Sequence, residues 1–241
     1  MMRTPNTRWP SVVEMEVNSR CNRRCTYCPN SLTEFSTANS FMEETLFEKI
    51  VVELEQIEFS GRLSFHFFNE PLIRRDLEAL VSWARPRLPL SYLVLYTNGD
   101  LLNEDRYSAL LRAGIDNFLV TRHDFDSYPS REFQFVQHPN NFTLSGRGGT
   151  IARSDEPLDL ACFGPSEMLI VTVNGDVVLC HEDAERRHVM GTFRTQTLPE
   201  IWFSDRFEAF RAPLEHGDRA RAGSMCRSCD NRLYPVPGTA I

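Results

Sequence analysis

The spacing of apolar residues changes repeatedly between Val12 and Val120. Short runs with strand-like composition alternate with longer runs in which apolar residues recur every three or four positions, as in an amphipathic helix. The pattern predicts strands over 11–18, 62–68, 91–96 and 117–121, and helices over 42–57, 73–84 and 104–113. This alternation predicts a parallel sheet covered by helices, with chemistry in the loops that leave the carboxyl ends of the strands.

After Ser127 the alternation stops. We expect 131–149 to be irregular, and Asn174-Gly175 between two apolar runs predicts a hairpin closed by a tight type I′ turn. A helix is predicted over 198–211. These patterns divide the chain into a core over 11–126, a connecting and substrate-contact segment over 127–160, and a small C-terminal module over 161–235.

Composition and charge narrow the class of protein. The 241 residues include 26 basic and 33 acidic side chains, giving a net charge of −7, and 41% are hydrophobic. An acidic chain without a basic run argues against nucleic acid as a partner, and no apolar stretch approaches the roughly 20 residues that span a bilayer. The N-terminus lacks the apolar core of a signal peptide. We therefore expect a cytoplasmic protein without nucleic-acid or membrane partners, in which disulfides are not expected.

Three of the seven cysteines, Cys21, Cys25 and Cys28, form a CxxxCxxC motif after the first predicted strand. Three thiolates can bind three irons of a [4Fe–4S] cluster and leave the fourth iron open, whereas such clusters normally take four cysteines. A zinc site or a redox pair is the alternative. Zinc would need a fourth Cys or His ligand, and Tyr27 inside the motif with Pro29 after it favours the cluster.

The other four cysteines are Cys162, Cys180, Cys226 and Cys229. Their spacing is typical of neither a zinc ribbon nor a ferredoxin. Four thiolates suit a structural zinc ion as well as an iron–sulfur cluster, so the spacing alone leaves both open.

The first motif, CNRRCTYC, resembles the signature of the radical S-adenosylmethionine (radical SAM) enzymes. The second set resembles the twitch module, a shortened form of the SPASM extension. The chain from about Val12 to Asn231 is similar to radical SAM dehydrogenases and epimerases of aminoglycoside pathways (butirosin, spectinomycin, hygromycin), in segments at 16–31, 65–72, 96–100, 120–123, 147–149, 171–183 and 189–191. The resemblance implies an α/β fold, a partial (β/α)6 TIM-like barrel followed by a twitch module made of a β-hairpin and a helix.

The resemblance also implies the chemistry. Two [4Fe–4S] clusters would be present, and SAM on the open iron would be cleaved to a 5′-deoxyadenosyl radical that abstracts hydrogen from carbon. The implied reaction oxidises a secondary alcohol of an aminocyclitol or aminoglycoside intermediate to a ketone in antibiotic biosynthesis, and the second cluster accepts the last electron. An external flavodoxin or ferredoxin with its reductase would reduce the first cluster.

The same resemblance implies the site residues. Glu70 lies where the family has a Gly-Gly-Glu-Pro-like segment for the SAM amino group, although both glycines differ here. Arg147, Glu182, Tyr96 and His181 are the predicted substrate-contacting or catalytic residues, with Glu182 the preferred acceptor of the hydroxyl proton. Taken singly, Glu70, Arg147 and His123 could instead be ordinary loop or structural residues. The full set predicted to bind SAM is Tyr27, Asn69, Glu70, Thr97, Asn98, Thr121, Arg122 and His123.

Two rival enzymes share the first chemical step. An epimerase would return a hydrogen atom to the opposite face of the carbon, commonly from a cysteine thiol, but all seven cysteines here are assigned to iron. Tyr96 or another group could replace the thiol. A peptide-modifying enzyme usually has an N-terminal peptide-recognition domain, and only about ten residues precede the first predicted strand. Both comparisons favour dehydrogenation.

Overall fold

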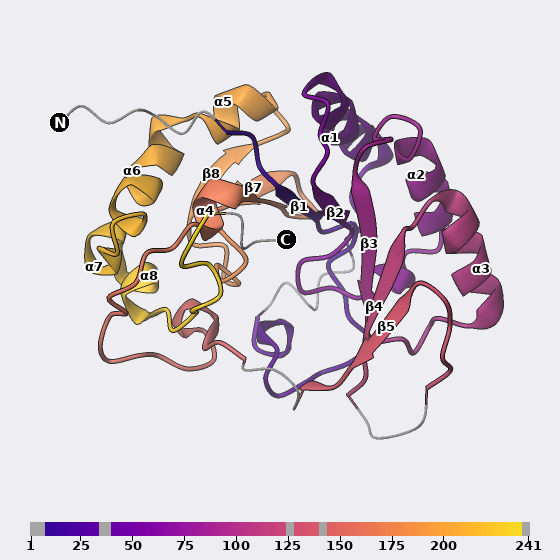
Figure 1. The fold of residues 1–241 in the computed structure, drawn as a ribbon, viewed down its shortest axis with the longest axis horizontal. Helices are drawn as coiled ribbons and strands as arrows, with labels where there is room; N and C mark the ends of the chain where they lie inside the picture. Colours follow the sequence, from indigo (N-terminus) through magenta and orange to yellow (C-terminus); the bar gives the residue numbers. More distant parts are fainter. Residues whose placement is uncertain (1–7, 34–39, 124–127, 140–143, 238–241) are drawn as a thin grey trace.

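The computed structural model describes residues 8–33, 40–123, 128–139 and 144–237. Its named strands form one eight-stranded sheet in the order β5-β4-β3-β2-β1-β6-β7-β8 (Figure 1). The first six in sequence pair in parallel, and β7 and β8 are antiparallel additions at one edge. The strands are β1 (Val12–Met15), β2 (Arg62–Ser64), β3 (Tyr92–Thr97), β4 (Asn117–Thr121), β5 (Gln134–Gln137), β6 (Met168–Val171), β7 (Asp176–Val178) and β8 (Val189–Thr192).

Three helices connect the first four strands and lie along one side of the sheet (Figure 1). These are α1 (Glu44–Gln56), α2 (Leu77–Ala84) and α3 (Glu104–Ala113), and the predicted alternation of strands and helices is confirmed. The remaining helical elements are η1 (Pro29–Ser31), η3 (Pro71–Ile73), η5 (Arg147–Gly149), α4 (Gly164–Glu167), α5 (Leu198–Trp202), α6 (Asp205–Leu214), α7 (Arg219–Ala222) and α8 (Ser224–Ser228).

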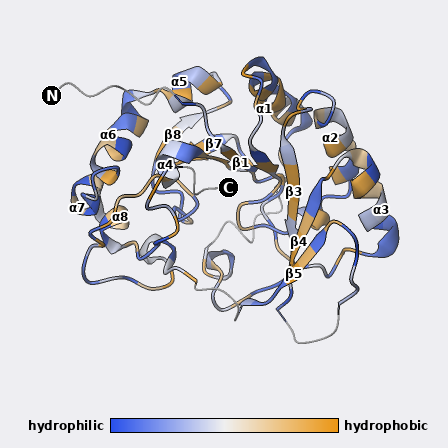
Figure 2. Cartoon of the chain, viewed as in Figure 1, coloured by the Kyte–Doolittle hydropathy of each residue, from blue (hydrophilic) through white to orange (hydrophobic). Residues whose placement is uncertain are grey.

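The sheet is packed on both faces. Val13 and Leu63 belong to the main core beneath the helices, whereas Val12 and Ile170 form a second apolar cluster. Side chains alternate along a strand, so Glu14 points to the same face as Val12. The mixture of hydrophobic and hydrophilic positions along α1, α2 and α3 in Figure 2 is that of helices with one buried side.

The predictions for 131–149 and for the turn at Asn174-Gly175 were wrong. The stretch 131–149 was expected to be irregular, but it contains β5, which extends the sheet through parallel pairing with β4. The predicted type I′ turn is instead a three-residue loop, 173–175, in which Gly175 N donates to Thr172 O at 2.8 Å. Gly175 has a φ of +89°, and Asn174 does not have the positive φ that a type I′ turn requires.

The strand β6 pairs with two partners. It is antiparallel to β7, as the hairpin prediction requires, and it is also parallel to β1 from Val12↔Met168 to Met15↔Val171. It is therefore the sixth parallel strand as well as the first hairpin strand. The sheet thus runs through all three predicted segments, and the boundaries at 126 and 160 stay predictions.

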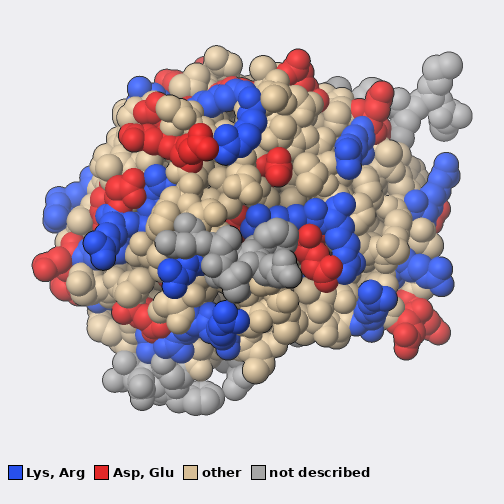
Figure 3. Space-filling view, turned by 180° about the vertical axis from the view of Figure 1, so that it is seen from behind, with Lys and Arg blue, Asp and Glu red and all other residues tan. Residues whose placement is uncertain are grey.

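The helix predicted over 198–211 is two helices. Thr197 and Glu200 form a capping box at the start of α5, and Ser204 begins α6 by accepting a hydrogen bond from Phe207 N at 3.3 Å. A second cap within the apolar pattern ends one helix and starts another. The described residues include no helix with the length and apolarity needed to span a membrane. Acidic and basic side chains are interspersed over the face seen in Figure 3.

Candidate active site

An open cleft of about 200 Å³ lies at the carboxyl ends of the parallel strands. The loop after β1 brings three thiols to it, and the loops after β2, β3 and β4 supply polar groups. This is the end of the strands where barrel enzymes carry their chemistry. The cleft is lined by Cys21, Arg23, Cys25, Tyr27, Cys28, Pro29, His66, Phe67, Phe68, Asn69, Glu70, Tyr96, Thr97, Asn98, Thr121, His123, Leu144, Arg147 and His181.

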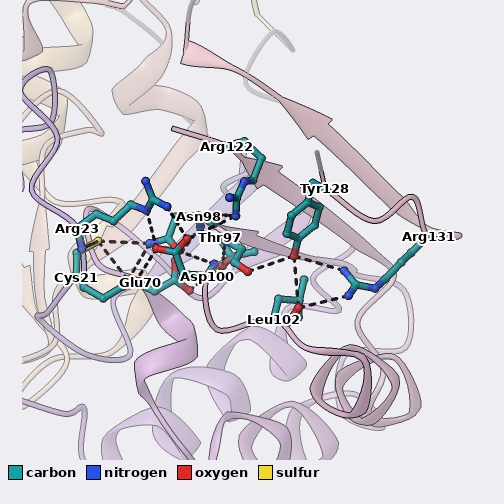
Figure 4. A network of polar contacts seen from close by, with 12 residues as sticks. Cys21, Arg23, Glu70, Thr97, Asn98, Asp100, Leu102, Arg122, Tyr128 and Arg131 are labelled. Atoms are coloured by element: carbon teal, nitrogen blue, oxygen red, sulfur yellow. Dashed lines mark hydrogen bonds and ion pairs between the residues drawn. The ribbon is translucent and has the colours of Figure 1, made fainter. Parts of the chain in front are cut away.

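Hydrogen bonds connect the cysteine loop to the turn that follows β3 (Figure 4). Asn98 Nδ2 donates to Asn22 Oδ1 at 2.8 Å and lies 3.8 Å from Cys21 Sγ. Arg23 binds both carboxylate oxygens of Asp100, at 2.5 and 2.6 Å. These bonds fix the thiol-bearing loop against the end of β3. Asp100 and Arg23 were not predicted from the sequence.

Glu70 connects the loop after β2 to the same turn. It is 2% exposed and accepts hydrogen bonds from Thr97 Oγ1 and Asn98 N at 2.8 Å and from Leu72 N at 3.0 Å. Burial raises the pKa of Glu70 to about 7, and the three hydrogen bonds oppose the rise. The predicted SAM residues Glu70, Thr97 and Asn98 are therefore one bonded unit at the cleft.

The side chain of Asn69 stabilises the loop that carries Glu70. Its Nδ2 donates to Asn18 Oδ1 at 3.0 Å, and its Oδ1 accepts from Phe67 N at 2.9 Å. Asn18 in turn donates to the carbonyl of Glu70 at 3.2 Å. The amide of Asn69 is thus engaged in holding the loop shape at the cleft wall.

Tyr27 and His123 face each other across the cleft, and the Tyr27 hydroxyl forms a hydrogen bond with His123 Nδ1. Thr121 lines the same wall and accepts from Gln137 Nε2 at 3.1 Å. Arg122 is not a lining residue. Its guanidinium lies over the ring of Tyr128 and 3.5 Å from Asp100 (Figure 4). Seven of the eight predicted SAM residues therefore line the cleft, and Arg122 lies behind it.

A second polar cluster borders the cleft. His181 Nδ1 lies 2.7 Å from Glu14 Oε2, and Arg62 lies 3.7 Å from the other oxygen of Glu14. Arg62 also donates to the Tyr96 hydroxyl, and the ring of His66 stacks on Tyr96 at 4.4 Å. Burial opposes ionisation of Glu14, but His181, His66 and Arg62 outweigh it and lower its pKa to about 2. The Glu14 carboxylate is therefore ionised and orients His181.

Sequence reasoning missed Glu14, Arg62 and His66. Burial lowers the pKa of His66 to about 4, and its Nδ1 lies 3.1 Å from Ser64 Oγ, so it is a neutral ring at the cleft. One sequence feature could have identified Glu14. A carboxylate inside the apolar run VVEMEV, in a predicted strand of a parallel sheet, is costly to bury without a partner.

The four remaining cysteines line a second, narrower cavity. Burial, followed by the neighbouring thiols, raises the pKa of Cys226 to about 12, and burial with Glu182 raises that of Cys229 to about 12. Four thiolates brought together, two of them buried, need a compensating positive charge, which the irons of a cluster supply. The donor set therefore fits an iron–sulfur cluster. The other lining residues are Gly164, Pro165, His181, Glu182, Leu214, Arg219, Met225, Asn231 and Tyr234.

Arg219 is a buried cation at this cavity, 3% exposed. It donates to the carbonyls of Cys229 at 3.2 Å and Asn231 at 2.9 Å. Its charge opposes the rise in the pKa of Cys162, Cys226 and Cys229. Arg219 thus stabilises both the shape and the negative charge of the site, and no sequence pattern singled it out.

Arg147 and Glu182 form an ion pair at 3.3 Å between the two cavities. Arg147 lines the cleft, whereas Glu182 is 4% exposed and lines the second cavity. Both Glu182 oxygens have protein donors, because Ser145 Oγ and Asn231 Nδ2 each lie 2.7 Å from one of them. His181 is the predicted site residue that lines both cavities.

Comparison with known families accounts for both cysteine sets. The radical SAM superfamily model matches residues 15–144, and the SPASM model, an iron-sulfur cluster-binding domain, matches residues 162–230. The chain belongs to the radical SAM superfamily. As a radical SAM enzyme with a SPASM region, it carries the radical SAM [4Fe–4S] cluster and a second iron–sulfur cluster.

This radical SAM enzyme is similar to known proteins over nearly its full length. It is 34% identical over 235 residues to the S-adenosyl-L-methionine-dependent 2-deoxy-scyllo-inosamine dehydrogenase of Niallia circulans, over 92% of this chain and 93% of the relative. The crystal structure of BtrN in complex with AdoMet and 2-DOIA has a TM-score of 0.87 at 33% identity, covering 95% of this chain and 96% of BtrN. A PqqA peptide cyclase of Gluconobacter oxydans is 38% identical over 116 residues, 48% of this chain and 31% of the cyclase. The full-length likeness is therefore to an alcohol dehydrogenase of this superfamily.

Proposed function

We propose that this radical SAM enzyme oxidises a secondary alcohol of an aminocyclitol, 2-deoxy-scyllo-inosamine or a close analogue, to a ketone in aminoglycoside antibiotic biosynthesis. One observation carries the proposal. The cleft with three thiols and the cavity with four share His181 as a lining residue. A substrate in the cleft would therefore lie beside a second redox centre, as a two-electron oxidation needs.

The cysteine sets divide the cofactors between them. Cys21, Cys25 and Cys28 would hold the first cluster and leave one iron for SAM, and the four cysteines of the second cavity would hold a fully ligated [4Fe–4S] cluster. When bound, these groups supply a 5′-deoxyadenosyl radical that takes hydrogen from the carbinol carbon and an acceptor for the remaining electron. The protein's part is to bind, orient and exclude water.

The SAM end of the cleft offers groups of the right type. Glu70 would receive the SAM amino group from its position beside Thr97 and Asn98. Tyr27, Thr121 and His123 would contact the rest of the molecule. Asn69 and Arg122, whose polar atoms face other protein groups, would support this wall.

The cleft also offers donors and acceptors for a polyhydroxylated, amino-substituted ring. Arg147 and Tyr96 would bind ring hydroxyls. His181 would accept a hydrogen bond from the reacting hydroxyl through Nε2, because Glu14 holds its Nδ1. Glu182, predicted to contact the substrate and to accept the hydroxyl proton, would instead act through Arg147, which lies 3.3 Å from it.

The distribution of cysteines favours oxidation over epimerisation. All seven lie in the described part of the chain, three at the cleft and four at the second cavity. An epimerase needs a hydrogen-atom donor on the opposite face of the substrate radical. No thiol is left for that role once both clusters are bound.

The first cluster needs an electron from outside. We expect a flavodoxin or ferredoxin with its reductase to supply it, and we expect the enzyme to work in the cytoplasm.

The test uses anaerobically reconstituted holoenzyme with SAM, a reductant and 2-deoxy-scyllo-inosamine. We expect one ketone for each 5′-deoxyadenosine, measured by mass spectrometry. Solvent deuterium at a ring carbon with no ketone would show an epimerase instead. Absence of substrate-dependent deoxyadenosine would overturn the proposed substrate class.

A further inference from the structure

The segment 145–149, which carries Arg147, is built directly onto the segment that carries the last two cysteines. Gly146 N donates to Asp230 Oδ1 at 2.7 Å. A Cβ at Gly148 would lie 2.8 Å from Met225 Cγ and 2.9 Å from Glu182 O. The backbone of Gly148 therefore packs directly against the side chain of Met225. We call 145–149 the arginine loop and 225–231 the cysteine segment.

Glu182 is the central residue of this contact. It follows Cys180 by two positions and accepts from Ser145 and Arg147 on the arginine loop and from Asn231 on the cysteine segment. The carboxylate is 4% exposed, so these bonds are made away from water. Hydrogen bonds to a buried charged group are among the stronger ones in proteins. Glu182 therefore joins the arginine loop to two of the stretches that bear cysteines.

The backbone of the arginine loop also needs external support. Arg147 and Gly148 have φ of +52° and +55°. A non-glycine residue in the left-handed region persists where its surroundings hold it. The contacts with Glu182, Met225 and Asp230 provide that hold.

We infer that the second cluster has a structural role besides accepting an electron: it fixes the cysteine segment, and that segment positions Arg147 in the cleft. The inference rests on the proposed function for the identity of the substrate. Ser145, Glu182, Asp230 and Asn231 are then positioning residues that act through Arg147. Assembly of the second cluster and affinity for the aminocyclitol are coupled through them.

We call the hydrogen bonds from Ser145 and Asn231 to Glu182 the tether. The first test breaks the tether and leaves every cysteine in place. Ser145→Ala removes one hydrogen bond to Glu182 and should raise the Kd for 2-deoxy-scyllo-inosamine about tenfold. Iron should stay at about eight per chain, and SAM affinity should not change. Ser154→Ala is the matched control. Ser154 Oγ donates to Glu156 O in the same stretch, and the substitution keeps the backbone bond from Ser154 N to Ser228 O.

Asn231→Ala tests the same tether from the cysteine segment, and it should raise the Kd to a similar extent with both clusters present. If both tether variants bound substrate like wild type with a full iron content, the inference would be wrong. A loss of iron in Asn231→Ala alone would assign that residue to cluster binding, and Ser145→Ala would then decide the question.

The second test needs no substrate and follows tryptic cleavage after Arg147 under anaerobic conditions. Cleavage should be faster in Cys226→Ala/Cys229→Ala protein and in Ser145→Ala holoprotein than in wild type. Cleavage after Arg112, which lies in α3 outside the arginine loop and the cysteine segment, should not change. Equal cleavage rates at Arg147 in all proteins would overturn the inference. If these rates differ as expected but no aminocyclitol binds to wild type, the proposed function fails and the tether stands.

Discussion

Glu14 Oε2 lies 2.7 Å from His181 Nδ1, and this contact joins the first strand of the sheet to the residue that follows Cys180. The two residues are 167 positions apart in the chain. Glu14 is 3% exposed and has Arg62 on its other side. The pair sets which nitrogen of His181 faces the cleft, and that orientation can be tested.

Glu14→Gln should lower the kcat of ketone formation about tenfold or more, because an amide no longer fixes the ring of His181. SAM affinity should stay near wild type. The measurement is single-turnover ketone formation at saturating substrate. Glu16→Gln is the control, since Glu16 binds Arg186 and Val173 N, and it should leave kcat unchanged per folded molecule. Unaltered kcat in Glu14→Gln would remove the pair from the reaction.

SAM binding should depend on pH through Glu70, whose pKa burial raises to about 7. The N–H groups of a bound SAM amino group favour the ionised carboxylate as their acceptor, so binding below pH 7 must release a proton. The Kd for SAM should therefore fall as the pH rises from about 6 to about 7 and then level off. Glu70→Gln should bind SAM more weakly and lose this dependence, as measured by equilibrium dialysis of reconstituted enzyme. A wild-type profile that is flat over this range would contradict the assignment.

Arg219→Met should lose the second cluster, because it removes a buried cation beside four thiolates and two hydrogen bonds to the cysteine segment. Iron should fall from about eight to about four per chain. The matched control is Arg221→Met, an exposed arginine on the same short helix. Full iron in Arg219→Met would show that the thiols hold the site without the cation.

Cys226→Ala/Cys229→Ala should separate the two halves of the reaction. The cleft keeps its three thiols, so 5′-deoxyadenosine should still form. Ketone should be absent even at substrate concentrations that offset weaker binding, because the electron acceptor is gone. Product analysis by mass spectrometry decides the outcome, and a normal ketone yield would assign the acceptor elsewhere.

The sequence predicts the parts of the site whose residues lie close together in the chain. CxxxCxxC identifies the first cysteine loop because its three thiols lie within eight residues. The polar residues after each apolar run, such as Asn69, Thr97 and Thr121, follow from the rule that parallel strands end at one edge. The ranges of α3 and β4 were predicted to the residue. Local periodicity and caps determine these features.

The missed parts depend on contacts between distant residues. Glu14 meets His181 because β6 pairs both with β1 and with β7, the strand that precedes His181, and apolar composition alone did not place β6 there. Glu182 binds Ser145, which lies 37 positions earlier in the chain, and Asn231, which lies 49 positions later. Strand β5 has two adjacent apolar residues, Phe135 and Val136, rather than an alternating pattern, and Phe135 is exposed, so the strand depends on backbone pairing with β4.

The double pairing of β6 has a consequence for dividing this enzyme. Removing everything after residue 160 would leave β1 paired with β2 alone. Its other edge would then be an apolar strand edge with unpaired backbone groups, a template for aggregation. The two iron centres therefore cannot be produced as separate halves or exchanged between enzymes by cutting at the connecting segment. A transplant would have to carry β6 together with the strand it completes.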